Sequence, residues 1–182
     1  MTKSEIEHFY PKTKQHWRKW LEKNHIKKDA VWLIHYKKNS GDPTLAWSDA
    51  VDAALCFGWI DSKAVSIDAI SYKQYYCKRK PRSTWSRVNK EKINQLMAEN
   101  KMTRAGLNCV EIAKQNGSWT ILDDVEALII PPDLAKALKS KLITRFRGLS
   151  KSAQKIHLQD LVAAKTTETR TKRIKKIVEK LS

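Results

Sequence analysis

Apolar residues follow two different periods in the first part of the chain, and their spacing predicts a mixture of helices and strands. Trp17, Trp20 and Leu21 occupy positions i, i+3 and i+4, which predicts a helix that follows Pro11. The branched and aromatic residues at 31–36 predict a strand buried on both faces, because neither alternate set of positions is polar throughout. The chain therefore opens with a helix followed by a strand.

A helix and a hairpin are predicted next. Ser48 is a suitable N-cap residue, and its helix should end at Gly58, since glycine readily adopts the left-handed conformation of a helix end. Two short extended runs, 63–67 and 72–79, lie close together in the sequence and predict an antiparallel hairpin.

Two more helices are predicted after the hairpin. One should begin near Ser83 or Ser86 and reach about Asn100. The next should be capped by Thr103 and end at Gly117. After that glycine the pattern loosens.

The last third of the chain is helical by pattern. Pro131-Pro132-Asp133 marks a break that no helix crosses. Three helices follow it, defined by Leu134 and Leu138, by Ala153, Ile156, His157, Leu161 and Ala164 after a Ser150 cap, and by Ile174, Ile177, Val178 and Leu181. We therefore predict an α+β fold, with a small, mostly antiparallel sheet and helices in a domain at 1–130 and a helical C-terminal subdomain at 131–182.

The balance of charged residues indicates which class of partner is favoured. The 182 residues include 36 Lys and Arg against 19 Asp and Glu, a formal net charge of +17. A charge of this sign favours anionic partners such as nucleic acid, phosphates or membrane headgroups, and says nothing about the fold. Apolar residues make up 41% of the chain, which excludes a wholly disordered or low-complexity protein.

The start of the chain and its cysteines indicate a compartment. No apolar stretch follows the first charges, and no apolar run approaches the ~20 residues of a membrane span. Cys56, Cys77 and Cys109 are widely spaced and odd in number, so they cannot form a complete set of disulfides. We therefore predict a cytoplasmic protein with reduced thiols and no transmembrane segment.

Motifs for catalysis and cofactor binding are absent from the sequence. It has no glycine-rich nucleotide loop and no hydrolase nucleophile motif, and its five histidines lack the spacing of metal ligands. Cys56 lies inside a predicted helix, which is the setting of an inert thiol. We predict no catalytic residue, no metal and no cofactor. Whether the chain is an enzyme stays open, with the balance against it.

The first candidate binding element is Gly58-Trp59-Ile60-Asp61, after a predicted helix end. There the indole of Trp59 could stack on a ring, and the carboxylate of Asp61 could bind a hydroxyl, an amine or an arginine. Equally, Trp59 could be a core residue with Asp61 bonded locally. The sequence leaves both interpretations open.

A basic segment supplies the second candidate element. Arg79 and Arg82 precede a predicted helix start, where free N–H groups, hydroxyls and guanidinium groups together suit a carboxylate or a phosphate. The further members of this candidate ligand-binding set are Ser83, Trp85, Ser86 and Asn89. The alternatives are a solvated basic loop with capping hydroxyls, and a purely structural ion pair of Asp61 with Arg79 or Arg82.

The C-terminal basic run is the candidate for a different partner. Arg170, Lys172, Arg173 and Lys176 lie on one amphipathic helix, which could contact the phosphates of nucleic acid or an anionic membrane surface. Because no recognition-helix, zinc or RNA-binding aromatic motif accompanies it, a solvated face opposite the apolar stripe is the favoured interpretation.

Several longer motifs resemble a known family. They are 54–61 (ALCFGWID), 79–90 (RKPRSTWSRVNK), 102–107 (MTRAGL), and Ala164-Lys165 with Glu168-Thr169-Arg170. In this order they are similar to the YdeI/OmpD-associated, or bacteriocin-protection, family. The resemblance implies a link to stress or bacteriocin resistance but no defined reaction. Where members commonly have Thr-Pro-Arg, this chain has Cys77-Lys78-Arg79, which puts any rigid turn at the proline in doubt.

The predicted function is binding rather than catalysis. We expect a binding protein for an anionic, ring-bearing small ligand, held where the 58–61 turn meets the 79–89 segment. Non-specific nucleic-acid binding through the basic surface is one alternative. A hydrolase-like enzyme with Asp61 as base beside Arg79 is the other. The sequence does not predict the oligomeric state.

Overall fold

The computed structural model describes residues 6–182, except for the side chain of Asn39. It contains two compact units. The first comprises the chain up to Ser83 together with Val88–Asn116, and the second comprises Thr84–Arg87 together with Gly117–Ser182. The α+β class is confirmed, with a sheet in the first unit and helices alone in the second.

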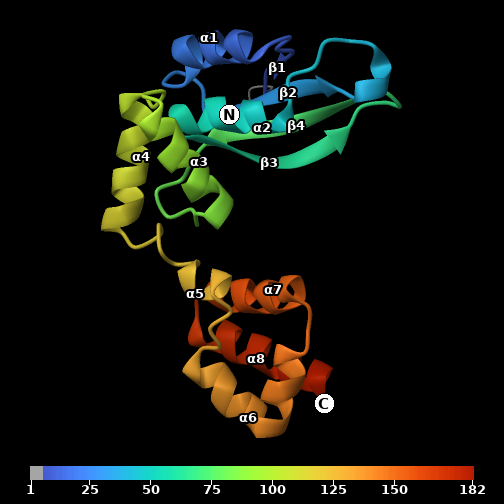
Figure 1. Cartoon of the computed structure of the whole chain (residues 1–182), viewed down its shortest axis with the longest axis vertical. Coiled ribbons are helices and arrows are strands. Elements are labelled where there is room, and N and C mark those ends of the chain that lie inside the picture. Colours follow the sequence, from blue (N-terminus) through green and yellow to red (C-terminus); the bar gives the residue numbers. More distant parts are fainter. Residues whose placement is uncertain (1–5) are drawn as a thin grey trace, which may run out of the picture. The chain divides into compact units, whose positions relative to one another are not determined.

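The sheet of the first unit has four strands in the order β1-β2-β4-β3. They are β1 (His8–Phe9), β2 (Ala30–Tyr36), β4 (Ser71–Lys78) and β3 (Trp59–Ser66). The predicted hairpin is confirmed as β3 and β4, and Figure 1 shows β4 between β2 and β3. Both hairpin strands pair antiparallel, whereas β1 pairs parallel with β2, so the sheet is mixed.

Only one face of the sheet is buried. Along β2, burial alternates strictly: Val31, Leu33 and His35 are buried, and the intervening residues are partly exposed. The prediction of a strand buried on both faces is therefore wrong for β2. The reason is that α1 and α2 contact the sheet through Trp17, Trp20 and Trp47, on the face that Val31 and its alternate neighbours share.

Helices of the first unit follow the predicted pattern closely. They are α1 (Lys14–Asn24), α2 (Trp47–Cys56), α3 (Arg87–Ala98) and α4 (Arg104–Gln115), with a short 3₁₀ turn η1 (Lys38–Ser40). Thr103 caps α4 as predicted. Ser48 does not cap α2, because the helix begins one residue earlier, and its hydroxyl accepts a hydrogen bond from Lys92 at 2.7 Å instead.

Aromatic rings form the centre of this unit. Trp17 donates its ring N–H to the Ala50 carbonyl at 3.0 Å, which ties α1 to α2. Its ring meets Tyr76 edge-on at 5.5 Å, and Trp20 meets Trp59 edge-on at 5.9 Å. These contacts join α1 to α2 and pack α1 against β3 and β4.

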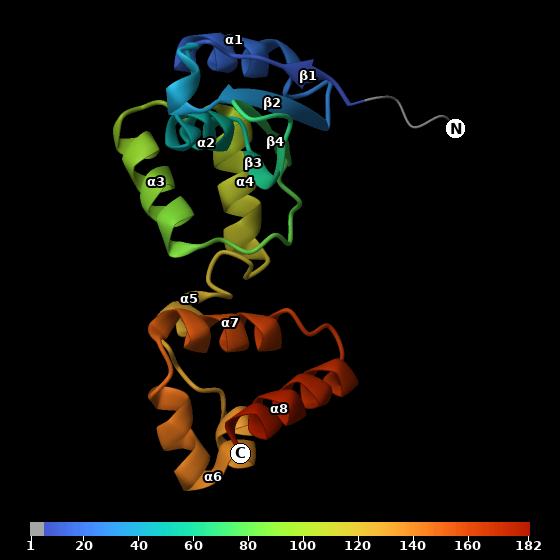
Figure 2. The same cartoon turned by 90° about the vertical axis from the view of Figure 1, so that its right-hand side faces the viewer.

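The second unit is a small helical bundle. It contains α5 (Asp123–Glu126), α6 (Pro132–Arg147), α7 (Lys151–Val162) and α8 (Thr167–Leu181), and Figure 2 shows α8 between α7 and α6. The core is formed by Leu122, Val125, Leu134, Leu138, Phe146, Leu158, Leu161 and Ile177. Because this core includes Leu122 and Val125, residues from 117 onward belong to the helical unit rather than to a domain that ends at 130.

The predicted start of α7 is reproduced. Ser150 caps α7, with its Oγ accepting from the Ala153 N–H at 3.2 Å. The backbone at Lys139 interrupts α6 (φ 54°, ψ 178°), so the helix is two segments joined by a kink. In the described part of the chain, no helix has both the length and the apolar character needed to cross a membrane.

Candidate functional site

Trp59 is a core residue and lines none of the cavities described below. Gly58, with φ +72°, turns the chain from the end of α2 into β3, so that Trp59 is the first residue of the strand. Its side chain is 0% exposed, and its ring N–H points to the His25 carbonyl at 3.4 Å. The predicted stacking face is therefore inaccessible to a ligand, because the whole side chain is buried.

Asp61 holds neighbouring elements together. Its Oδ2 accepts hydrogen bonds from the ring N–H of Trp47 at 2.9 Å and from the amide of Gln74 at 3.0 Å. Those contacts link α2, β3 and β4, in agreement with the local-bonding interpretation. Asp61 does not line the cavity beside Arg79, and its Oδ2 is already engaged by Trp47 and Gln74.

Arg79 occupies a buried position directly after β4. Its backbone N–H donates to the Gly58 carbonyl at 2.9 Å, and its side chain is only 9% exposed. Burial lowers the pKa of Arg79 to about 10, while the nearby Cys109 and Asp61 act in the opposite direction. The guanidinium thus keeps its charge at neutral pH in a poorly hydrated setting.

The side chain of Arg79 lines a cavity of about 220 Å³ in the first unit, which we call the Arg79 cleft. Its other lining residues are Phe57, Gly58, Lys78, Pro81, Ala105, Asn108, Cys109 and Ile112. None of these is acidic. Lys78 is already paired, with Asp29 at 2.9 Å and the Ile26 carbonyl at 2.8 Å. Burial raises the pKa of the Cys109 thiol, so this group is neutral and adds no negative charge.

The remaining residues of the predicted site are not gathered in this cleft. Arg82 is exposed, Ser83 and Asn89 are partly buried, and none of the three lines the cleft. Trp85 and Ser86 fall within Thr84–Arg87, which belongs to the second unit.

The contacts of Trp85 explain its assignment to that unit. It is 2% exposed, and its ring packs against Trp119 at 4.9 Å. Of the eight predicted ligand-binding residues, Arg79 lines the cleft and the others do not.

The basic run of α8 is divided between structural and exposed residues. Arg170 donates to Asp133 of α6 through two nitrogens, one of them at 2.9 Å, and to the Leu161 carbonyl of α7 at 3.1 Å. Arg173 pairs with Asp160 at 3.1 Å. Both arginines therefore fasten α8 to its neighbours, whereas Lys172 and Lys176 are exposed.

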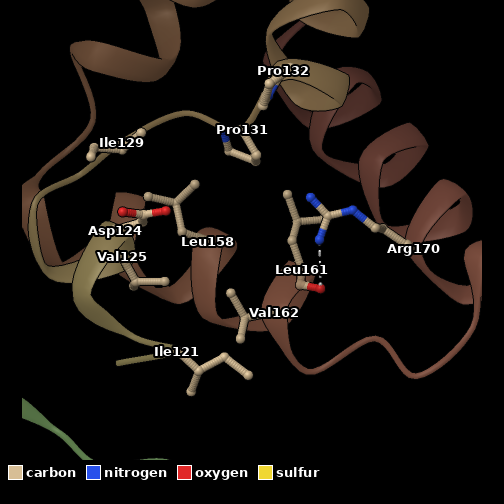
Figure 3. Close-up of a pocket in the computed structure, with 10 residues that line it drawn as sticks. All are labelled: Ile121, Asp124, Val125, Ile129, Pro131, Pro132, Leu158, Leu161, Val162 and Arg170. Carbon is tan, nitrogen blue, oxygen red and sulfur yellow. Dashed lines mark hydrogen bonds between the residues drawn. The ribbon is translucent and has the colours of Figure 1, made fainter. Parts of the chain in front are cut away.

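A second cavity, of about 250 Å³, lies within the second unit (Figure 3). Asp124 and Arg170 lie on opposite sides of it, and the side chains between them are apolar, chiefly Val125, Leu158 and Leu161. The guanidinium there is already bound to Asp133 and to the Leu161 carbonyl. This cavity would suit a small apolar group.

The outer face of the sheet carries a cluster that sequence reasoning missed. Trp32 and Tyr75 lie opposite each other on β2 and β4, with their rings edge-on at 5.0 Å. The ammonium groups of Lys63 and Lys73 lie 5.4 and 4.9 Å from the centre of the Trp32 ring. Alternation along each strand was the available signal, but only the register between strands brings these residues together.

The structure offers no evident site for a metal ion. Among residues 6–182, no group of three or more His, Cys, Asp and Glu side chains could hold one. The three cysteines are free thiols, and burial raises the pKa of Cys56, as expected for an inert thiol.

Comparison with known families divides the chain in two. A family model described as a domain of unknown function, DUF8412, matches residues 9–109, more than half of the chain. The family described as Bacteriocin-protection, YdeI or OmpD-Associated matches residues 127–182. No curated protein and no solved structure matches the chain.

The resemblance drawn from the sequence is confirmed for the C-terminal part alone. The motifs at 54–61, 79–90 and 102–107 all lie within the other matched stretch, and only those near Arg170 fall in the second. The chain belongs to the DUF8412 family, and its residues 127–182 match the model of the Bacteriocin-protection, YdeI or OmpD-Associated family.

Proposed function

We propose that this chain is a binding protein for a small anionic molecule, which the Arg79 cleft holds. The observation that carries the proposal is a guanidinium that is 9% exposed and lines an open cavity with no acidic neighbour in its wall. An anion in the cleft would lie beside this buried positive charge, where the low local dielectric strengthens their attraction.

The walls of the cleft indicate the size and character of the ligand. A volume of about 220 Å³ suits a compact molecule such as a phosphate or a short carboxylic acid. Phe57, Pro81 and Ile112 supply apolar contacts, and the exposed amide of Asn108 supplies both a donor and an acceptor. The proposal no longer includes stacking on Trp59 or Trp85, since both rings are buried.

Nucleic-acid binding by α8 is a less favoured function, because part of the positive charge of this helix is already paired within the chain. Two of its four candidate cations, Arg170 and Arg173, already hold carboxylates of Asp133 and Asp160. Phosphate contacts there would have to displace those intramolecular pairs.

A titration with inorganic phosphate tests the proposal. We expect phosphate to raise the Tm of the chain at constant ionic strength, where sodium chloride alone does not, and calorimetry to detect one site. Arg79→Ala should abolish both effects. Arg82→Ala removes the same charge from an exposed residue three positions later and should leave both unchanged.

A second variant distinguishes a loss of phosphate binding from a loss of folding. Asn108 is exposed on α4, so Asn108→Asp should fold normally while placing a negative charge at the rim of the cleft. It should weaken phosphate binding at least tenfold. Unchanged phosphate binding in both Arg79→Ala and Asn108→Asp would overturn the proposal, as would a Tm that rises equally with phosphate and chloride. In case phosphate is too small, a panel of short mono- and dicarboxylates is titrated in parallel.

A further inference from the structure

The outer face of the sheet brings rings and cations together. Because Val31, Leu33 and His35 of β2 point into the core, the alternate residues point outward. The register sets Trp32 opposite Tyr75 of β4 and beside His8 of β1. We call Trp32, Tyr75, His8, Lys63 and Lys73 the outer-face cluster.

Cations surround the two rings of this cluster. Lys63 lies 5.4 Å from the centre of the Trp32 ring and 6.0 Å from that of Tyr75. Lys73 lies 4.9 Å from Trp32, and its ammonium is 3.0 Å from the Nε2 of His8, whose ring is stacked parallel to the indole at 6.5 Å. All five side chains are at least partly exposed. Within the described chain neither lysine pairs with a carboxylate, so both are held by the rings alone or with His8.

The outward positions carry no negative charge. In β2 and β4 the residues on this face are Ala30, Trp32, Ile34, Tyr36, Ser71, Lys73, Tyr75 and Cys77, all of them described and none acidic. Asp61, the acidic residue of β3, is paired with Tyr76 and lies on the opposite face. The described outward positions of β2 and β4 therefore carry aromatic rings and a lysine with no acidic side chain among them.

We propose that the outer-face cluster binds single-stranded nucleic acid, with unpaired bases stacked on Trp32 and Tyr75 and phosphates bound by Lys63, Lys73 and His8. Rings on an open sheet accept bases that are splayed out of a single strand, whereas a duplex keeps both faces of each base covered by its neighbours. When a base stacks on a ring, the lysine that lay over that ring gives up its weak contact with the ring and binds a phosphate instead. The proposal is independent of the Arg79 cleft.

Fluorescence anisotropy of the full chain with labelled oligonucleotides tests this proposal. The probes are 12-nucleotide oligo(dT) and oligo(U) and a duplex of the same length. We expect at least one of the single strands to bind about tenfold or more tightly than the duplex. Trp32→Ala and Tyr75→Ala should each weaken that binding by about tenfold without changing its salt dependence. Trp32→Phe retains a ring and should recover most of the loss, which separates stacking from a fold defect.

Matched charge variants distinguish binding through the lysines of this face from binding through the overall positive charge of the chain. The double variant Lys63→Gln/Lys73→Gln should flatten the slope of log K against log salt by about 0.7 for each phosphate that the face no longer binds. Lys172→Gln/Lys175→Gln makes the same change in charge on α8, where both side chains are over 70% exposed, and should leave the slope unchanged.

The proposal would be overturned by no binding at low salt, by a duplex bound as tightly as either single strand, or by equal losses of affinity from the α8 and outer-face variants. Competition by poly-glutamate as strong as that by the oligonucleotide would also overturn it, in favour of an acidic polypeptide partner.

Discussion

Gly106 lies where α4 packs against the end of α2 with no space for a side chain. A Cβ atom there would lie 2.3 Å from the carbonyl oxygen of Cys56. That oxygen cannot easily move, because it accepts hydrogen bonds from both the N–H and the hydroxyl of Thr103, at 3.0 and 2.6 Å. A glycine inside a helix, usually unfavourable, is here the condition for close packing of two helices.

We therefore expect Gly106→Ala to destabilise the protein although alanine is the better helix former. Overpacking against the fixed carbonyl should lower the free energy of unfolding by about 2 kcal/mol, measured by urea denaturation. Gly148→Ala is the matched control, because its Cβ would meet nothing closer than 3.4 Å and its φ is −74°. A Gly106→Ala variant as stable as Gly148→Ala would contradict this account of the packing.

His35 gives the first unit a dependence on pH. Its Nδ1 lies 3.0 Å from the Leu45 carbonyl and so carries the proton, while its buried Nε2 has no hydrogen-bond partner in the described chain. Burial lowers the pKa of His35, against the weaker effect of the Leu45 hydrogen bond. The folded state therefore resists a second proton that the unfolded chain accepts below its ordinary pKa of about 6.5.

Stability should consequently fall as the pH is lowered below about 6.5, by up to about 1.4 kcal/mol per pH unit, until the lowered pKa is reached. His157 acts in the same direction in the second unit, because burial and then Lys180 lower its pKa. We expect His35→Phe to be less stable than the wild type at neutral pH. Its free energy of unfolding should, however, change less steeply with pH between pH 5 and 7. Urea denaturation across that range, with His157→Phe in parallel, assigns each part of the slope. The same slope in His35→Phe as in the wild type would exclude this histidine as the source.

At the scale of the helices, α8 is held by arginines as well as by its apolar stripe. Arg170 binds Asp133 of α6 with two nitrogens, and this hydrogen bonding lowers the pKa of the Asp133 carboxyl. The side chains are 30% and 44% exposed, so solvent weakens the pair. Its contribution is present above the ordinary pKa of Asp, about 3.9, and is lost as the pH falls through the lowered value.

We expect Arg170→Ala to destabilise the second unit by about 0.5 to 1 kcal/mol at pH 7 and by less in acid. Hydrogen exchange followed by mass spectrometry should show faster exchange in peptides of α6 and α8. Lys172→Ala breaks an i,i+4 pair with Glu168 that is over 70% exposed on both sides, and it should leave exchange unchanged. If the two variants behave alike, Arg170 is a surface charge and its availability for nucleic acid must be reconsidered.

Elements with a clear period were predictable from the sequence, and those without one were not. Helix α4 follows from Thr103 and its apolar stripe, and α8 from the spacing of Ile174 and Ile177. Strand β1 has two residues and exists through its pairing with β2, which no local pattern encodes. The single turn of α5 was missed because four residues are too few to show a helical period.

The candidate site was harder to predict than the fold because it depends on contacts between distant residues. Trp59 fits equally well as a ligand wall or a core residue until Trp20 and the His25 carbonyl are seen beside it. Trp32 and Tyr75 are separated by a long stretch of chain, and strand register alone makes them neighbours. Net charge, by contrast, does not depend on how the strands pair, so the basic character of the chain was evident from its composition.

For the whole molecule, that charge cannot be neutralised internally. With 36 basic and 19 acidic side chains, at least 36 − 19 = 17 bases would remain even if every acid paired with one of them. Many acids are in fact engaged within the described chain, among them Asp52 with Lys92 and Glu126 with Lys155. The excess positive charge therefore repels itself, which favours association with anions over the isolated state.

Trp85 shows that the second unit is not one continuous stretch of sequence. It belongs to Thr84–Arg87, which is grouped with residues from Gly117 onward, and its ring is 2% exposed against Trp119. A fragment that begins at Gly117 would lack this contact. We thus expect Trp85→Ala in the full chain to destabilise the second unit by about 3 kcal/mol, as for other buried tryptophans.

Hydrogen exchange followed by mass spectrometry distinguishes the two units in this experiment. Peptides of α5, α6, α7 and α8 should exchange faster in Trp85→Ala, although the substitution lies before α3 in the sequence. Val88→Ala is the matched control, since Val88 is 53% exposed at the start of α3 and belongs to the first unit. Faster exchange confined to the sheet and α1 would assign Trp85 to the other core. Faster exchange in α5–α8 would mean that a short segment placed between β4 and α3 is needed to complete the C-terminal bundle.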